Sequence, residues 1–383
     1  YILKAMFDKV TKSIRVISAA AVEKANSGHP GMPMGMAEVG TVLFKNALKI
    51  SNKYPEWINR DRFVLSAGHG SMLLYSLLHF SGFNISIDDI KQFRQLGSKT
   101  AGHPEVDTSL GIDITTGPLG QGFATGVGLA LAESYLSEVL GNDVIDHYVY
   151  GIVSDGDLME GISFEAAELA GVWKLGKLIY VFDDNNISID GSVDKVSITN
   201  QKKKFESVGW QVLEIDGHNE SEITEAINLS KEETNMPSLI IAKSTIGKFA
   251  PNKQNTSSVH GAPLGSDEME LFLSEINWEG DPFDHGEDIY EYFAEKRLED
   301  QNIQLLVISS SSGHHLQTAQ RAIKNGISVI STSNKVSDVV GLLKLEDSAN
   351  ENGAMIVAGA AFAPGSVSYT HLRAHETRED LVL

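Results

Sequence analysis

The sequence predicts an α/β fold in which a parallel sheet carries helices on both faces. Between residues 62 and 244, short apolar runs alternate with stretches of helical periodicity, which is the pattern of consecutive βαβ units. Two of the apolar runs end abruptly at polar side chains: HYVYGIVS stops before Asp155, and KLIYVFDD stops before Asn185. No internal repeat of fixed period is visible.

Helices dominate the first hundred residues. Residues 7–27 place apolar side chains at helical spacing and end at Gly28-His29-Pro30, where Gly followed by Pro stops a helix. The next expected elements are a helix over 34–48, a short strand over 62–65, the loop SAGHG over 66–70 and a helix over 71–82.

Strands and helices alternate from residue 115 onward. The loop TTGPLGQG, residues 115–122, leads into a helix of small and apolar residues over 123–140. The elements expected after it are a strand over 147–154, a helix over 161–173, a strand over 177–184, a strand over 209–216, a helix over 221–231 and a strand over 237–244.

The composition excludes several classes of function. A net charge of −20 argues against a nucleic-acid surface, and the absence of cysteine excludes disulfides, thiolate metal sites and cysteine nucleophiles. No apolar run approaches the roughly 18 residues of a spanning helix, so no membrane contact is expected. The lack of a signal peptide favours a cytoplasmic location, although the start at Tyr1 indicates a truncated chain.

Asp155 and Asn185 are candidate ligands of one cation. Each follows a strand, and one crossover helix separates the two strands, so both residues are expected at the same edge of the sheet. A carboxylate and an amide oxygen suit Mg²⁺ or Ca²⁺ completed by phosphate oxygens. Taken alone, the two residues are also compatible with ordinary turn positions after strands.

Glycines and histidines surround the same expected crevice. Gly117, Gly120 and Gly122 open a helix whose N-terminus could receive an anion, although a tight turn explains them equally well. Four histidines lie in loops of small residues with Gly or Pro beside them: His29, His69, His103 and His260. Together they predict a pocket in which imidazoles bind hydroxyls, phosphates or a reacting carbonyl.

The combined motifs resemble transketolase. The segments SGHPGMPMG, SAGHGSMLLYSLLH, KTAGHPE, TTGPLGQG, DGDLMEGISFEAAELAGVWKLGKLIYVFDDNNISIDG and HGAPLG occur in that family's order over residues 5–295. The resemblance implies that 1–295 is a diphosphate-binding domain of the thiamine-diphosphate fold. It also implies transfer of a two-carbon ketol unit between sugar phosphates in the pentose phosphate pathway, by a homodimer.

The resemblance assigns roles to individual residues. Asp155, Asn185 and the carbonyl of Ile187 would hold the metal, Mg²⁺ or Ca²⁺. The other assigned residues are His69, Gly156 and His260 at the diphosphate, Gly117 and Leu119 along the cofactor rings, and His29, His103 and His260 in catalysis. Glu160 and Glu165 would lie near the subunit interface, although acids near a helix N-terminus are also favourable by themselves.

Three short stretches depart from the family's usual sequence. Ser154 replaces the first Gly of Gly-Asp-Gly, which is tolerable if its φ is negative. Phe249-Ala250-Pro251 stands where Gly-Ser-Pro is usual, in a loop expected to close over the cofactor, and Gly97 replaces a common histidine. None of these changes removes an expected ligand.

The resemblance stops near residue 296. The pyrimidine-binding domain of transketolases is not recognisable, so the chain is expected to be inactive alone. Residues 296–365 form a small α/β fragment that faintly resembles a saccharopine-dehydrogenase-type nucleotide-binding domain, or else an idiosyncratic insert, and without the glycine fingerprint no NAD site is expected. Residues 366–383 resemble translated adapter sequence and are expected to be a disordered, artefactual tail.

Two alternative functions remain open at this stage. One is the N-terminal binding subunit of a split transketolase, active only with a partner chain. The other is a different thiamine diphosphate enzyme, such as a deoxyxylulose-phosphate synthase, which fits the Asp155–Asn185 pair but fits the histidine set and HGAPLG less well.

Overall fold

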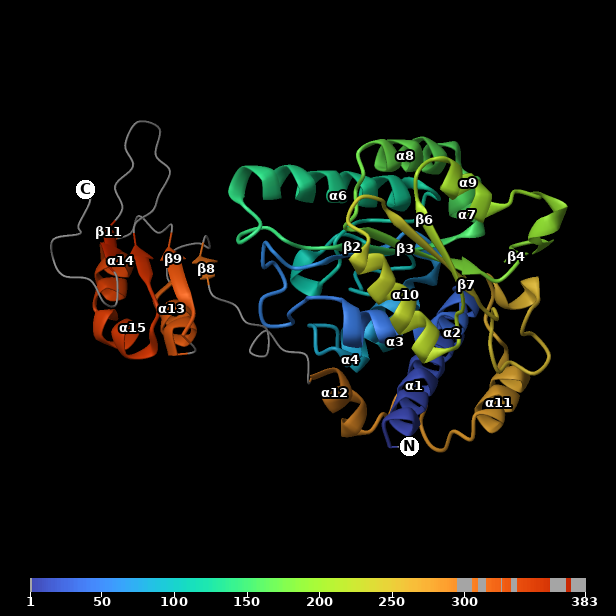
Figure 1. Cartoon of the computed structure of the whole chain (residues 1–383). Helices are drawn as coiled ribbons and strands as arrows, with labels where there is room; N and C mark the ends of the chain where they lie inside the picture. The colour runs from blue at the N-terminus through green and yellow to red at the C-terminus, as the bar shows by residue number, and fades with distance from the viewer. Residues whose placement is uncertain are drawn as a thin grey trace. The chain divides into compact units, whose positions relative to one another are not determined.

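Figure 1 shows the computed structural model of the chain, which describes residues 2–294, 305–308, 315–324, 326–331, 336–358 and 370–372. The chain divides into two units, Tyr1–Lys296 and Arg297–Leu383. Within the described residues, no helix is both long enough and apolar enough to cross a membrane.

A five-stranded sheet forms the centre of the first unit. Its strands lie in the order β1-β2-β3-β7-β6, and every neighbouring pair is parallel. The strands are β1 (Arg62–Leu65), β2 (Val149–Ser154), β3 (Leu178–Asp184), β6 (Gln211–Asp216) and β7 (Ser238–Lys243). The predicted α/β class with a parallel sheet is therefore confirmed.

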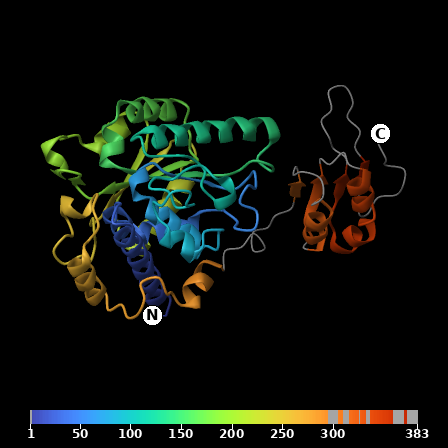
Figure 2. The ribbon, with the colours of Figure 1, turned by 180° about the vertical axis from the view of Figure 1, so that it is seen from behind.

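Apolar side chains project from both faces of the sheet into two buried clusters. On β2, Tyr150 and Ile152 join one buried cluster, whereas Val149 and Val153 join another on the opposite face. The first cluster is covered by α1 (Ile2–Ala25), α3 (Ala37–Val42), α4 (Ser71–Phe80) and α10 (Glu220–Glu232). The second is covered by α6 (Gln121–Leu140), α8 (Gly161–Val172) and α9 (Gln201–Ser207), and Figures 1 and 2 show the two helical layers from opposite sides.

Shorter elements complete the first unit. They are α2 (Gly31–Gly35), α5 (Ile87–Lys91), α7 (Asp155–Met159), α11 (Ser266–Glu275), α12 (Glu287–Ala294) and the hairpin of β4 (Ile187–Ser188) with β5 (Gly191–Ser192). The single helix predicted over 34–48 is wrong, because α2 and α3 are separate and a π-helical turn follows over Leu43–Ala47. The break lies at Met36, whose φ of −100° and ψ of 16° are not helical. The preceding Gly35 packs against the loop after β7, since a Cβ there would lie 2.9 Å from the carbonyl oxygen of Thr245.

The second unit contains a small sheet of its own. Strands β8 (Leu305–Ile308), β9 (Ser328–Ser331) and β10 (Ile356–Ala358) are parallel, and β11 (Thr370–Leu372) pairs antiparallel with β10. The described residues of this unit also form the helices α13 (His315–Lys324), α14 (Val336–Leu343) and α15 (Glu346–Asn352). Apart from β11, the tail predicted over 366–383 lies outside the described residues.

Candidate functional site

A cavity of about 370 Å³ lies where loops follow the carboxyl ends of β2 and β3. Parallel sheets bind ligands at this edge. The structure brings every predicted site residue to this cavity: His29, His69, His103, Gly117, Leu119, Asp155, Gly156, Asn185, Ile187 and His260. The loops that carry them are far apart in sequence, so the fold assembles the site from separate segments.

One end of the cavity, here called the carboxylate end, is lined by Asp155, Asp183 and Asn185. Asp157, two residues after Asp155, is fully buried and does not line the cavity. Asp155 begins α7 directly after β2 and is only 8% exposed. Burial, together with the neighbouring carboxylates of Asp183 and Asp184, raises the pKa of Asp155 to about 7. A cation beside Asp155 would offset both effects.

The side chain of Asn185 is held in a fixed orientation. Its amide nitrogen donates to Asp183 Oδ2 at 2.8 Å, and its Oδ1 accepts from the backbone N–H of Ile187 at 2.9 Å. Asn186 makes the turn between them with a φ of +60°. Asp183 itself is buried and accepts a hydrogen bond from Ser244. The sequence reasoning missed the role of Asp183, although the repeated aspartate in VFDDNN was available as a signal.

Asp157 connects the end of β2 with two loops behind the carboxylate end. Its Oδ1 accepts from Ser66 Oγ at 2.8 Å and from the N–H of Gly120 at 3.0 Å. Its Oδ2 accepts from both the N–H and the Oγ of Ser154, each at 3.0 Å. The sequence reasoning missed this residue too, because nothing in the motif separates Asp157 from an ordinary residue of a helix's first turn.

The other end, here called the histidine end, contains His29, His69, His103 and His260. The ring centroid of His29 lies 5.3 Å from that of His69, 6.2 Å from that of His103 and 5.9 Å from that of His260. The rings of His69 and His260 stack at 5.0 Å. These distances confirm that the four loops converge.

Burial keeps these imidazoles neutral. It lowers the pKa of His29 to about 4, with the charges of His260, Arg94 and His103 acting in the same direction. Burial is also the largest cause that lowers the pKa of His69, His103 and His260. A neutral imidazole offers one donor and one acceptor, so each ring can hold a ligand oxygen or exchange a proton with it.

Arg94 is a further residue that the sequence reasoning missed. It adopts a φ of +62° and donates from Nη1 to Ser27 Oγ at 2.7 Å, next to the loop of His29. Its positive charge lowers the pKa of both His29 and His103. No pattern around it in the sequence indicated this position.

Two of the departures from the family sequence leave the site intact. Ser154 has a φ of −120°, which suits a residue with a side chain. Gly97 has a φ of +77°, and a Cβ there would meet nothing within 4 Å. Glu160 and Glu165 do not line the cavity; both are exposed, Glu160 directly before α8 and Glu165 within it.

Comparison with known proteins decides the family. The sequence profile described as "Transketolase, thiamine diphosphate binding domain" matches residues 7–319. The chain belongs to the transketolase family. Transketolase from Bacillus subtilis is 52% identical over 291 residues, which are 75% of this chain and 44% of that protein. Transketolase 1 from Escherichia coli is 48% identical over 286 residues, which are 74% of this chain and 43% of that protein.

Solved transketolase structures share the fold. Transketolase from Campylobacter jejuni has a TM-score of 0.73 at 45% identity, over 76% of this chain and 46% of that one. Transketolase from Pichia stipitis in complex with sedoheptulose 7-phosphate has a TM-score of 0.74 at 40% identity, over 77% of this chain and 44% of that one. This chain therefore spans less than half the length of these transketolases. The family match runs past the end of the first unit.

Proposed function

We propose that the cavity holds thiamine diphosphate through a divalent cation, Mg²⁺ or Ca²⁺. The convergence of the carboxylate end and the histidine end on one cavity is the observation that carries this proposal. The family match describes a thiamine diphosphate binding domain, which agrees with it.

The residues fit such a group chemically. Nδ1 of His29 and Nδ1 of His260 are buried and have no hydrogen-bond partner among the described residues, so both can receive ligand oxygens. A Cβ on Gly156 would lie 3.0 Å from Leu119 Cδ1, so glycine keeps space open beside the cavity. In the described part of the chain, no three His, Cys, Asp or Glu side chains are gathered as metal ligands, so a cation here needs oxygens from its ligand.

Each residue has a role in this proposal. Asp155, Asn185 and the carbonyl of Ile187 hold the cation. His69, Gly156 and His260 contact the diphosphate, and Gly117 and Leu119 lie along the cofactor rings. His29 and His103, both neutral, bind sugar hydroxyls and move protons at the reacting centre, with His260 beside them.

The whole reaction that we propose is transfer of a two-carbon ketol unit from a ketose phosphate to an aldose phosphate. Bound thiamine diphosphate supplies the electron sink for breaking the carbon–carbon bond. This chain contributes orientation of the cofactor, exclusion of water by burial, and the neutral imidazoles. We propose that turnover requires a pyrimidine-binding domain and a homodimer, in which Glu160 and Glu165 lie near the interface.

Titration calorimetry with thiamine diphosphate and Mg²⁺ tests the binding step. The intact chain should bind, and Asp155→Ala should weaken binding by about 100-fold, because second-shell losses alone cost 10–100-fold. Asp190→Ala is the matched control, since it removes an exposed acid beside the cavity loop without lining the cavity. Equal affinity in Asp155→Ala and the intact chain would contradict the metal assignment.

Complementation tests the transfer step. A separate pyrimidine-binding domain chain is added, and ketol transfer between sugar phosphates is followed by product formation. Transfer should appear with both chains and thiamine diphosphate present, and disappear with Asp155→Ala. Binding without transfer in any mixture would leave the cofactor proposal standing and refute the transferase proposal.

A further inference from the structure

The loop after β7 forms one wall of the cavity. It carries Ile246 and His260, which both line the cavity. Two buried acids hold this loop from different sides, Glu38 near its start and Glu268 near its middle. Glu268 accepts from the N–H of Asn252 at 2.8 Å, from Asn252 Nδ2 at 2.9 Å and from the N–H of Lys253 at 3.1 Å.

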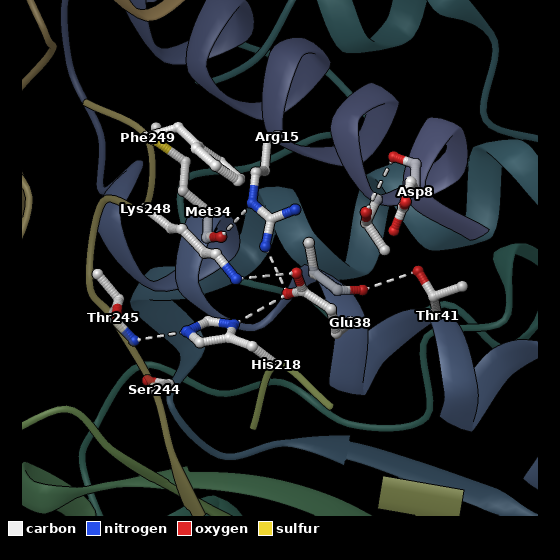
Figure 3. A network of polar contacts seen from close by, with 12 residues as sticks. Asp8, Arg15, Met34, Glu38, Thr41, His218, Ser244, Thr245, Lys248 and Phe249 are labelled. Carbon is white, nitrogen blue, oxygen red and sulfur yellow. Dashed lines mark hydrogen bonds and ion pairs between the residues drawn. The ribbon is translucent and has the colours of Figure 1, made fainter. Parts of the chain in front are cut away.

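Glu38 gathers three basic side chains, as Figure 3 shows. Arg15 pairs with its Oε2, and Lys248 Nζ lies 3.3 Å from its Oε1. His218 lies between Glu38 and the loop, because its Nδ1 is 3.2 Å from Glu38 Oε2 and its Nε2 accepts from the N–H of Thr245 at 3.0 Å. Burial alone would raise the pKa of Glu38, but Arg15, His218 and Lys248 hold that pKa below its usual range.

Phe249 lies in a strained conformation beside this cluster. Its φ is +72°, a left-handed value that is unfavourable for any residue with a Cβ. The ring is held by two cations: Arg15 Cζ lies 5.2 Å and Lys248 Nζ 5.4 Å from its centroid. Phe249 also packs against the buried cluster that contains Ile246, Ala250 and Val259. These contacts compensate for a backbone conformation that glycine would adopt without strain.

We propose that Phe249 is a positioning residue, whose ring locks the loop after β7 in its cavity-forming conformation before any ligand binds. The ring of Phe249 contacts Arg15 and Lys248, and these contacts hold the loop that carries Ile246 and His260; this effect is called the lock below. It deepens the proposed function, because these two residues belong to that site. At this position the family's usual glycine is replaced by Phe249, so the loop that the resemblance expects to close over the cofactor carries a ring with contacts of its own.

Hydrogen exchange of the intact 383-residue chain tests the lock. The reporter amides are Gly247, Ala250 and Asn255, which donate to the carbonyls of Gly31, Gly247 and Ile246. In the unmodified protein they should exchange equally slowly with and without thiamine diphosphate and Mg²⁺. Slow exchange only after ligand addition would overturn the proposal, and this comparison needs no variant.

Three substitutions of Phe249 distinguish the effect of its aromatic contacts from the effect of its left-handed backbone conformation. Phe249→Tyr keeps both aromatic faces and should exchange as the unmodified protein does. Phe249→Leu keeps the bulk and the strain without the aromatic face, and Phe249→Gly removes both. In these two the reporter amides should exchange about tenfold faster without ligand, which is the scale of two partly desolvated cation–π contacts. Exchange as slow as in the unmodified protein in both variants would overturn the role of the ring.

Repeating the exchange measurement with thiamine diphosphate and Mg²⁺ tests this inference and the proposed function separately. In Phe249→Leu and Phe249→Gly, thiamine diphosphate with Mg²⁺ should bind about tenfold more weakly and restore slow exchange, because binding must then order the loop. If thiamine diphosphate binds to no form of the protein while the ligand-free exchange rates differ as expected, the proposed function fails and the lock stands.

Discussion

At the carboxylate end of the cavity, the acids behind the surface are tied to loops by hydrogen bonds, whereas at the histidine end buried ring nitrogens lack partners. Asp157 alone accepts four hydrogen bonds from three residues, and Asp183 accepts from Asn185 and Ser244. By contrast, Nδ1 of His29 and Nδ1 of His260 have no hydrogen-bond partner in the described part of the chain.

The two ends of the cavity differ in what their polar groups do: one set holds the backbone in place, and the other is available to a ligand. Hydrogen-bonded acids fix the position of the backbone from which Asp155 and Asn185 reach the cavity, so this end is organised before a ligand arrives. Unpartnered buried imidazoles are costly unless a ligand pairs with them, so the histidine end retains binding capacity. The hydrogen bonds of the carboxylate end should therefore contribute more to the stability of the fold, whereas the histidine end should keep free ring nitrogens for a ligand.

Removing Asp157 should have the largest effect on stability. Asp157→Ala leaves the donors of Ser66, Gly120 and Ser154 without their acceptor inside the protein, so the free energy of unfolding should fall by about 3 kcal/mol. Urea unfolding measures this change.

The control for that measurement is Asp190→Ala, an exposed acid whose removal should change the free energy of unfolding by less than about 0.5 kcal/mol. A similar small change in Asp157→Ala would show that the hydrogen bonds of Asp157 do not organise the carboxylate end. The difference proposed between the carboxylate end and the histidine end would then be refuted.

Acid should act on the histidine end. The pKa of His29 is lowered from 6.5 in the unfolded chain to about 4 in the fold, so the unfolded state binds the proton more readily. Its contribution to stability is therefore complete above pH 6.5 and is lost as the pH falls toward 4. His29→Gln should abolish a part of this loss on the order of 1–2 kcal/mol, discounted for solvent screening.

Urea unfolding of the two proteins at pH 8 and pH 5 measures the difference. The gap between the unmodified protein and His29→Gln should change with pH in the stated direction, with His29→Gln gaining relative stability at pH 5. If the difference in free energy of unfolding between the two proteins is the same at both pH values, the pKa of His29 is not lowered by folding.

Much of the fold was predictable because its signals are local. The alternation of apolar runs and helical periodicity predicted the parallel sheet, since strands buried on both faces need near-continuous apolar sequence. The break between α2 and α3 was not predicted, and neither was the packing of Gly35 against Thr245, because the two residues are more than two hundred positions apart in sequence.

In the candidate site too, residues marked by a local pattern were predicted, and residues that depend on distant partners were not. Strand ends and Gly or Pro neighbours mark Asp155, Asn185 and the four histidines within short windows of sequence. Asp157 and Arg94 carry no such mark, because their importance lies in partners from distant loops. Sequence motifs thus identified most polar residues that line the cavity but missed Asp183, and they missed Asp157 and Arg94, whose partners come from distant loops.

Ser154 offers the smallest and most selective test of the carboxylate end. Ser154→Ala removes the bond from Oγ to Asp157 and the side-chain half of the capping box at the start of α7, so the free energy of unfolding should fall by about 1 kcal/mol. Ser154→Gly, which restores the family's usual glycine, should cost a further roughly 0.5 kcal/mol, because a φ of −120° needs no glycine and the unfolded chain gains freedom. The N–H of Ser154 still donates to Asp157 in both variants, so cofactor affinity should change little. Should Ser154→Gly prove more stable than Ser154→Ala, the backbone at this strand end would be under strain that the observed φ does not show, and the claim that hydrogen bonding alone organises this end would fail.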